Sequence, residues 1–256
     1  MTYEMSVQPS LAKAYSIVTE LKKLSDGQVI LGYSGGKDSI VCLDLLHRAG
    51  FSRIVCMYWY LVPGLRVVEP WFEFARKRYG VTEILQVPSM TAVAAVRHGI
   101  HMPLTQASER APARYGILDA SRLVQKRTGL KWLVFGFKES DSLERRGEIA
   151  NTKGLDVKRR ISYPIGYFKP KDVRDYFRAA KIPRHTHMKG MNGITLRPKH
   201  ILWLYDEHRE DYERVRLVFP GVENIVRRRE FFPETATPQR RRRGKKASQT
   251  GDGATA

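Results

Sequence analysis

The stretch Gln28-Val-Ile-Leu-Gly-Tyr-Ser-Gly-Gly-Lys-Asp-Ser-Ile-Val-Cys-Leu-Asp-Leu-Leu-His-Arg-Ala-Gly50 decides the fold of this chain. Residues 28–33 predict a buried strand, because apolar residues follow one another with little alternation. Residues 40–49 predict a helix, and Gly50 suits the position just after its last turn. A second apolar run follows at residues 53–60. The order strand, glycine-rich loop, helix, strand has the size of a βαβ unit with a right-handed crossover.

Predicted strands and helices alternate along the chain on both sides of this unit, up to residue 136. Strands are predicted at residues 83–87 and 131–136, and helices at residues 10–24, 67–79, 90–98 and 112–128. This pattern favours an α/β fold with a doubly wound, mostly parallel sheet of the Rossmann-like kind. Ligands of such sheets bind outside the carboxyl ends of the strands. Residues 34–39 and 136–146 both follow strands, so we expect both segments at that edge.

The loop Ser34-Gly-Gly-Lys-Asp-Ser39 has the composition of a phosphate-binding turn, although it lacks the Walker A spacing. Gly35 and Gly36 allow backbone N–H groups to converge on an anion, and the following helix points its positive end at the same place. Ser34 and Ser39 add hydroxyl donors and Lys37 adds a cation. Asp38 is expected to cap the helix or to hold Mg²⁺ through water.

The run Leu31-Gly-Tyr-Ser-Gly-Gly-Lys-Asp-Ser-Ile40 resembles the PP-loop of the adenine-nucleotide α-hydrolase superfamily. That superfamily includes phosphoadenosine phosphosulfate (PAPS) reductases, ATP sulfurylase small subunits, tRNA-modifying ligases and thiolases, and amidating synthetases. The resemblance implies that the loop binds the pyrophosphate of ATP while a nucleophile attacks the α-phosphorus to give an adenylate. In the reductases, the loop serves a sulfonucleotide instead.

Two later blocks resemble the PAPS reductase-like family in the same order along the chain. Val134-Phe-Gly-Phe-Lys-Glu-Ser-Asp-Ser-Leu-Glu-Arg-Arg146 is similar to its "G-x-R-x-x-E-S-x-x-R" stretch, with a lysine near the usual arginine and slightly shifted spacing. Tyr163-Pro-Ile-Gly-Tyr-Phe-Lys-Pro-Lys-Asp-Val-Arg-Asp-Tyr-Phe177 is similar to its "P-I-x-x-W-x-x-x-D-V-W-x-Y" segment. The candidate catalytic residues are therefore Lys37, Asp38, Lys138 and Arg145, and the candidate nucleotide-binding residues are Ser34, Gly35, Gly36, Lys37, Asp38, Ser39, Gly136, Glu139 and Arg146.

After residue 160 the pattern becomes more helical. A short apolar run at residues 161–165 and a helix at 169–180 are followed by an irregular segment at 185–197 and helices at 198–218 and 221–231. We expect a nucleotide-binding α/β domain over residues 1–183, a helical extension over 184–232 and a disordered basic tail over 233–256.

Positive charge is the strongest signal in the composition. The 256 residues carry a net charge of +19, of which residues 233–256, with six basic and two acidic residues, supply +4 and the rest +15. Such a field attracts polyanions, so we expect a nucleic-acid partner, DNA or tRNA. The sequence shows no secretory signal and no apolar run long enough to cross a membrane, and cysteine is rare. These features predict a cytoplasmic protein without a membrane contact.

The cysteine content argues against sulfonucleotide reduction. The tail carries no nucleophilic cysteine, and Cys42 and Cys56 fall in a predicted helix and strand, where buried positions are expected. His185-Thr-His187 lacks a third ligand at a useful spacing, so we expect no structural metal site.

Three functions remain open. The first is an ATP pyrophosphatase that uses Mg²⁺ to adenylate a substrate in nucleic-acid modification, with a partner protein that supplies or accepts the modifying group. The second is a non-catalytic, nucleotide-dependent DNA-binding or regulatory protein. The third, and weakest, is a reductase that uses Cys42 or Cys56.

Overall fold

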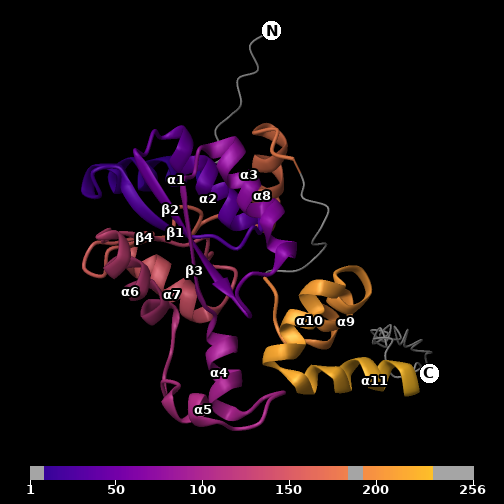
Figure 1. Cartoon of the computed structure of the whole chain (residues 1–256). Coiled ribbons are helices and arrows are strands. Elements are labelled where there is room, and N and C mark those ends of the chain that lie inside the picture. Colours follow the sequence, from indigo (N-terminus) through magenta and orange to yellow (C-terminus); the bar gives the residue numbers. More distant parts are fainter. Residues whose placement is uncertain (1–8, 184–192, 233–256) are drawn as a thin grey trace, which may run out of the picture.

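The computed structural model describes residues 9–183 and 193–232, and this part of the chain contains a six-stranded sheet in the order β3-β2-β1-β4-β6-β5 (Figure 1). The strands are β1 (Gln28–Gly32), β2 (Arg53–Tyr60), β3 (Glu83–Pro88), β4 (Leu133–Val134), β5 (Leu155–Asp156) and β6 (Ile161–Ser162). All pair in parallel except β5, which runs antiparallel to β6. The predicted doubly wound, mostly parallel α/β fold is therefore confirmed.

The chain reverses its direction across the sheet between β1 and β4. From β1 it proceeds outward through β2 to β3, and it then returns to β4 on the other side of β1 before adding β6. In register, Ile30 of β1 pairs with Val55 on one side and with Leu133 on the other. Such a reversal point is where open α/β sheets bind their ligands, beyond the carboxyl ends of the strands.

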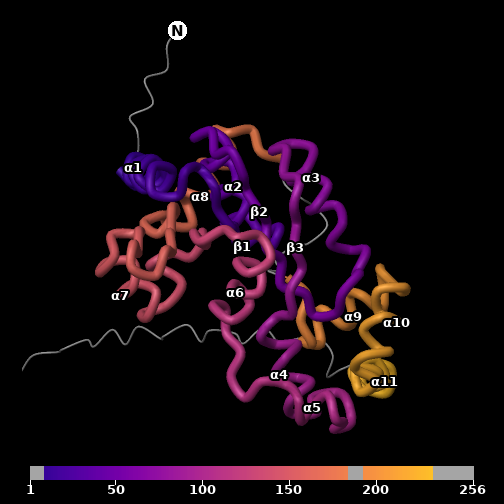
Figure 2. The backbone as a smooth tube through the Cα atoms, turned by 60° about the vertical axis from the view of Figure 1, so that its left-hand side comes forward, coloured from indigo at the N-terminus to yellow at the C-terminus, as the bar shows by residue number. Residues whose placement is uncertain are grey.

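Helices cover both faces of the sheet (Figures 1 and 2). One layer contains α1 (Pro9–Leu24), α2 (Lys37–Arg48), α3 (Glu69–Tyr79) and α8 (Pro170–Ala179), and the other contains α6 (Ile117–Thr128) and α7 (Leu143–Thr152). Side chains alternate along β1, so that Val29 and Leu31 pack into the first layer and Ile30 into the second. Both faces of β1 are apolar for this reason, which explains its unbroken hydrophobic run.

The C-terminal helices share the core of the α/β part. They are α9 (Pro198–Glu207), α10 (Arg209–Val218) and α11 (Glu223–Phe231). Ile201 and Leu204 belong to the same apolar cluster as the first helical layer. The buried Asp211 carboxylate accepts hydrogen bonds from the backbone N–H groups of Arg66 (2.8 Å) and Val67 (2.7 Å) in the 3₁₀ turn η1 (Arg66–Val68).

A further backbone hydrogen bond joins the C-terminal helices to the segment after β3. There, α4 (Met90–His98) and α5 (Gln106–Arg110) extend away from the sheet toward α11 (Figure 2). The backbone N–H of Gly221, in the 3₁₀ turn η3 (Pro220–Val222), donates to the His101 carbonyl at 2.7 Å.

The structure corrects several expected boundaries. The strand expected at 131–136 is only Leu133–Val134, and the helix expected at 112–128 begins at Ile117. The single helix expected at 198–218 is two helices, because His208 adopts φ −139° and ψ 61°. Helix α7 was not expected at all. Residues 184–192 and 233–256, including His185, His187 and the basic tail, lie outside the described residues.

Within residues 9–183 and 193–232, no helix combines the length and the apolar character that crossing a membrane requires.

Candidate functional site

The loop between β1 and α2 is shaped by the close approach of an indole ring. Gly35 has φ 68°, in the left-handed region, and a Cβ atom at this position would lie 2.5 Å from Cδ2 of Trp71. Trp71 is only 1% exposed, and its carbonyl accepts a hydrogen bond from the Tyr33 hydroxyl at 3.0 Å. The glycine is therefore required both by its backbone angle and by the buried ring against it.

Serine hydroxyls hold the rest of the turn. Ser39 Oγ donates to the Gly36 carbonyl at 2.9 Å and accepts from the Ser34 N–H at 3.3 Å. The Gly36 N–H in turn donates to Ser34 Oγ at 3.3 Å. Both serines thus act inside the loop, fixing the conformation of the backbone.

The first turn of α2 keeps free donors. Gly36 is the N-cap, in an extended conformation, and no side chain caps the helix. The backbone N–H groups of Lys37, Asp38 and Ser39 donate no hydrogen bond to any of the described residues. The Lys37 side chain is exposed beside them. Unsatisfied N–H groups at a helix N-terminus, together with an ammonium group, form a binding place for an anion.

Gly136 brings the end of β4 against this helix start. A Cβ atom on Gly136 would lie 3.0 Å from the carbonyl carbon of Asp38 and 3.2 Å from the Ser39 nitrogen. Gly136 is predicted from the sequence as a nucleotide-binding residue. The structure gives it a further reason to be glycine, because the two backbones meet there. Segments 34–39 and 136–146 therefore lie at the same edge of the sheet, as predicted.

Lys138 connects these two segments through charge. Its ammonium nitrogen lies 2.8 Å from Oδ2 of Asp38 and 3.3 Å from Oδ1 of Asp141. The whole residue is only 5% exposed, and its N–H donates to Asp141 at 2.8 Å. The other oxygen of Asp38, Oδ1, is buried and has no hydrogen-bond partner among the described residues. Burial of an ammonium group costs free energy unless opposite charges compensate it, and Asp38 and Asp141 supply that compensation for Lys138.

Of the remaining predicted residues, Arg145 and Arg146 lie on α7 and Glu139 precedes it. The Glu139 N–H donates to the Gly166 carbonyl at 2.9 Å. The Arg145 guanidinium lies 4.2 Å from the centre of the Phe137 ring and pairs with Glu148 at 2.5 Å, and not with Glu139. Arg146 is exposed and forms no ion pair within the described part of the chain. The structure brings the loop, Gly136 and Lys138 together, while Arg145 belongs to a neighbouring network.

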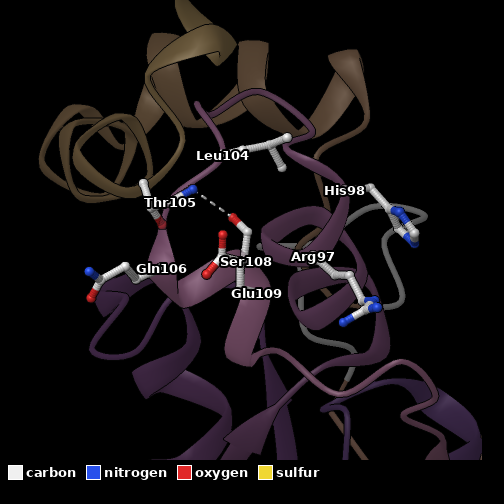
Figure 3. A pocket seen from close by; sticks show the side chains of 7 residues that line it. All are labelled: Arg97, His98, Leu104, Thr105, Gln106, Ser108 and Glu109. Atoms are coloured by element: carbon white, nitrogen blue, oxygen red, sulfur yellow. Dashed lines mark hydrogen bonds between the residues drawn. The ribbon is translucent and has the colours of Figure 1, made fainter.

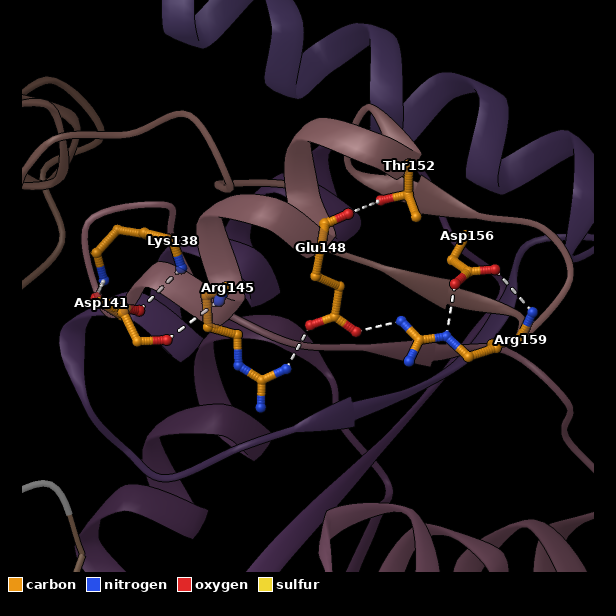
Figure 4. A network of polar contacts seen from close by, with 8 residues as sticks. Lys138, Asp141, Arg145, Glu148, Thr152, Asp156 and Arg159 are labelled. Atoms are coloured by element: carbon orange, nitrogen blue, oxygen red, sulfur yellow. Dashed lines mark hydrogen bonds and ion pairs between the residues drawn. The ribbon is translucent and has the colours of Figure 1, made fainter.

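That network is centred on Glu148, which the sequence analysis did not single out. Its carboxylate is shared between Arg145 and Arg159, and Arg159 also pairs with Asp156 at 2.6 Å (Figure 4). Burial of Glu148 opposes its ionisation, but hydrogen bonds from Arg159, Tyr163 and Arg145 outweigh that effect and hold its pKa below the ordinary value. Glu148 and Asp156 together thus balance the charges of Arg145 and Arg159.

A pocket lies away from the loop, between α4 and α5 (Figure 3). It has a volume of about 560 Å³ and is lined by Arg97, His98, Leu104, Thr105, Gln106, Ser108 and Glu109. Arg97 donates to the Ala111 carbonyl at 2.6 Å, and Ser108 Oγ accepts from the Thr105 N–H at 3.1 Å. Arg97 thus joins α4 to the end of α5, and Ser108 caps the start of α5.

The comparisons with known proteins concern the fold. No protein-family model and no curated protein matches the sequence. Among solved structures, the chain is similar to the U34-tRNA thiolase NcsA from Methanococcus maripaludis, with 15% identity, a TM-score of 0.41, and coverage of 84% of this chain and 80% of that chain. It is also similar to a PAPS reductase from Candida auris, with 12% identity, a TM-score of 0.41, and coverage of 72% and 91%.

Proposed function

We propose that this chain binds ATP or a related adenine nucleotide at the 34–39 loop and cleaves it between the α and β phosphates to adenylate a substrate. The observation that carries the proposal is the set of unpaired N–H groups of Lys37, Asp38 and Ser39 at the start of α2, beside the exposed Lys37 ammonium group. Phosphate oxygens satisfy such donors, and the helix dipole favours their negative charge.

Asp38 fits a role toward Mg²⁺. One of its carboxylate oxygens is held by Lys138 and the other is buried without a partner, so one hard oxygen is left to offer. Magnesium in nucleotide sites is usually bound by one or two carboxylates together with phosphate oxygens. Mg²⁺ would supply neutralisation of the pyrophosphate charge when bound.

The residues of the loop would stabilise the departing pyrophosphate. When an acceptor oxygen attacks the α-phosphorus, the bond to the bridging oxygen breaks and negative charge grows on the β-phosphate. The N–H groups at the start of α2 and the Lys37 ammonium group are fixed near that charge, which is the kind of preorganised stabilisation that catalyses phosphoryl chemistry. The acceptor's proton leaves to solvent or to a base of the acceptor's own binding partner.

The two cysteines disfavour the reductase alternative. Cys42 and Cys56 are both completely buried. Burial raises the pKa of each thiol well above its usual range, so neither is a thiolate at neutral pH. Reduction of a sulfonucleotide requires an accessible thiolate.

A non-catalytic nucleotide-dependent DNA-binding protein is the second candidate. It is favoured by the pairing of Lys138 with Asp38 and Asp141, because an ammonium group then holds an oxygen of each of these two carboxylates and disfavours their action as a base toward an acceptor. Such a protein would need the same phosphate-binding loop but no acceptor beside it.

The experiment measures pyrophosphate release and ATP affinity for the wild type, Lys37→Ala and Lys171→Ala. The reaction contains ATP, Mg²⁺ and either tRNA or duplex DNA. We expect Lys37→Ala to lose release and to weaken ATP binding by at least tenfold, about 1.4 kcal/mol. Lys171→Ala is the matched control, because Lys171 is an exposed lysine on α8. ATP binding without release, with nucleic-acid affinity that changes when ATP is added, would favour the second candidate. Absence of calorimetric ATP binding would refute both.

A further inference from the structure

A second polar pocket lies at the opposite edge of the sheet, where β4 and β6 begin. It has a volume of about 390 Å³ and is lined by Gln125, Gly129, Leu130, Lys131, Lys158, Arg159 and Arg160. Two turns form it, one between α6 and β4 and one between β5 and β6. We refer to these seven residues as the basic pocket.

Three of the four cations of the basic pocket form no ion pair with any of the described residues. Arg159 is neutralised, because it pairs with Asp156 and Glu148. Lys131, Lys158 and Arg160 are exposed and form no ion pair within the described part of the chain. Lys126 and Arg127, which are also exposed and unpaired there, stand in the last turn of the helix that supplies Gln125.

The backbone fixes these cations at the edge of the sheet. Arg160 has φ 56°, in the left-handed region, and its carbonyl accepts the Leu133 N–H at 2.9 Å. Gln125 Nε2 donates to the Lys131 carbonyl at 2.8 Å. Asp156 accepts the Arg159 N–H at 2.9 Å, which closes the second turn. The two turns are therefore tied to β4 and to α6, which fixes the backbone positions of the residues that carry these cations.

We infer that the basic pocket is a binding surface for the phosphodiester backbone of a nucleic acid. Unpaired lysine and arginine side chains are the groups that neutralise backbone phosphates. The lining offers one apolar residue, Leu130, which is only 8% exposed. A protein partner would need an apolar core at its interface, and a membrane would need apolar or aromatic anchors, so the chemistry favours a polyanion.

The inference is separate from the proposed reaction. The basic pocket and the 34–39 loop lie at opposite ends of the parallel strands, and the five residues of β1 span about 17 Å at ~3.3 Å per residue. Bound nucleotide and bound nucleic acid therefore do not compete for the same groups. A nucleic acid is also long enough to rest on one edge while presenting another part of itself to the other.

The test compares two variants that remove the same charge. The first combines Lys131→Gln, Lys158→Gln and Arg160→Gln, and the matched control combines Lys171→Gln, Arg174→Gln and Lys181→Gln. The control residues are exposed and unpaired within the described residues, and they include a left-handed residue, Lys181, with φ 49°. Binding is measured by fluorescence anisotropy between about 50 and 200 mM salt, with DNA and RNA duplexes of the same sequence and about 20 base pairs.

For the DNA duplex, we expect the slope of log K against log salt to become shallower by about 2.7 in the first variant, since each phosphate contact contributes about 0.9. The control variant should keep most of the wild-type slope. The stronger of the DNA and RNA effects identifies the source of the phosphodiester. Equal slopes for the first variant and the wild type would overturn the inference, and so would an equal loss in the control. Loss of binding only to vesicles of about one-third phosphatidylserine would assign the surface to lipid instead.

ATP affinity of the same variants separates this inference from the proposed function. The basic-pocket variant should bind ATP as the wild type does, and Lys37→Ala should keep its nucleic-acid affinity in the absence of ATP. A weakened ATP affinity in the basic-pocket variant, with a normal thermal midpoint, would contradict the independence of the two edges.

Discussion

The two edges of the sheet both carry lysine, but they use it differently. At the loop edge, Lys138 is 5% exposed and bound by Asp38 and Asp141, whereas at the opposite edge Lys131 and Lys158 are exposed and unpaired within the described chain. A buried lysine costs free energy unless its charge is compensated, so Lys138 serves to join two segments of protein. An exposed lysine costs little and remains available to an external anion. The difference shows that burial and pairing with carboxylates, and not residue type, determine which of these lysines are open to a ligand.

The largest expected effect tests the rigidity of the loop edge. Gly35→Ala should destabilise the protein by about 3–4 kcal/mol, because it adds left-handed strain to a clash with a buried indole ring. Gly80→Ala is the control: Gly80 has φ 65°, but a Cβ there meets nothing within 4 Å. It should cost about 1–2 kcal/mol, from the backbone alone. Urea denaturation measures both. Equal losses would show that Trp71 moves aside freely.

The next effect tests the buried ion cluster. Lys138→Met should lower the free energy of unfolding by about 2 kcal/mol, less than a fully buried pair would lose, because Asp38 and Asp141 have side chains 28% and 39% exposed and regain water. It should also weaken ATP binding about tenfold, since Asp38 then faces the phosphates with uncompensated charge. Calorimetry with ATP and Mg²⁺ checks the second outcome. Tighter ATP binding in this variant would mean that Lys138 competes with Mg²⁺ for Asp38.

A smaller effect is expected in the ion-pair network centred on Glu148. Glu148 and Asp156 have pKa values held below their ordinary values. Their stabilisation is therefore present above the unfolded-state pKa, near 4, and is lost as the pH falls through the folded pKa. Glu148→Gln should cost about 1 kcal/mol at pH 7 and flatten the fall in stability on the acid side. Thermal midpoints measured from neutral to acid pH test this, and an unchanged acid slope would contradict it.

The smallest effect is expected at the basic pocket. Lys131→Gln with Lys158→Gln should change the free energy of unfolding by less than about 0.5 kcal/mol, because both side chains are exposed and neither pairs with another of the described residues. The same urea titration measures it. A loss as large as that of Lys138→Met would show that the two edges do not differ in the way described above.

The loop and its flanking strand and helix follow from local sequence. The apolar run of β1, the two glycines and the periodicity of α2 each act over a few residues, so the fold class and the position of Ser34–Gly36 were predictable. The partners of these residues were not. Lys138 approaches the loop because β1 and β4 are neighbours in the sheet, and Trp71 approaches it because α3 packs beside α2. No local pattern records either relation.

Helix α7 shows why a regular element was missed. Only Ile149 of its ten residues is buried, so it has no apolar stripe for periodicity to reveal. One local signal was present: Ser142 is its N-cap and accepts a hydrogen bond from the Arg145 N–H at 3.1 Å. The break at His208 between α9 and α10 contains no glycine or proline, so no residue in the sequence indicates that the helix ends there.

Gly136 has a consequence for how this protein tolerates change. Its α-carbon rests on the peptide that joins Asp38 to Ser39, with no room for a methyl group unless that peptide moves. A substitution of Gly136 would therefore shift the start of α2, far away in the sequence, even in the absence of a ligand. Because the contact is with backbone atoms, this restriction on position 136 holds whatever side chains occupy positions 38 and 39.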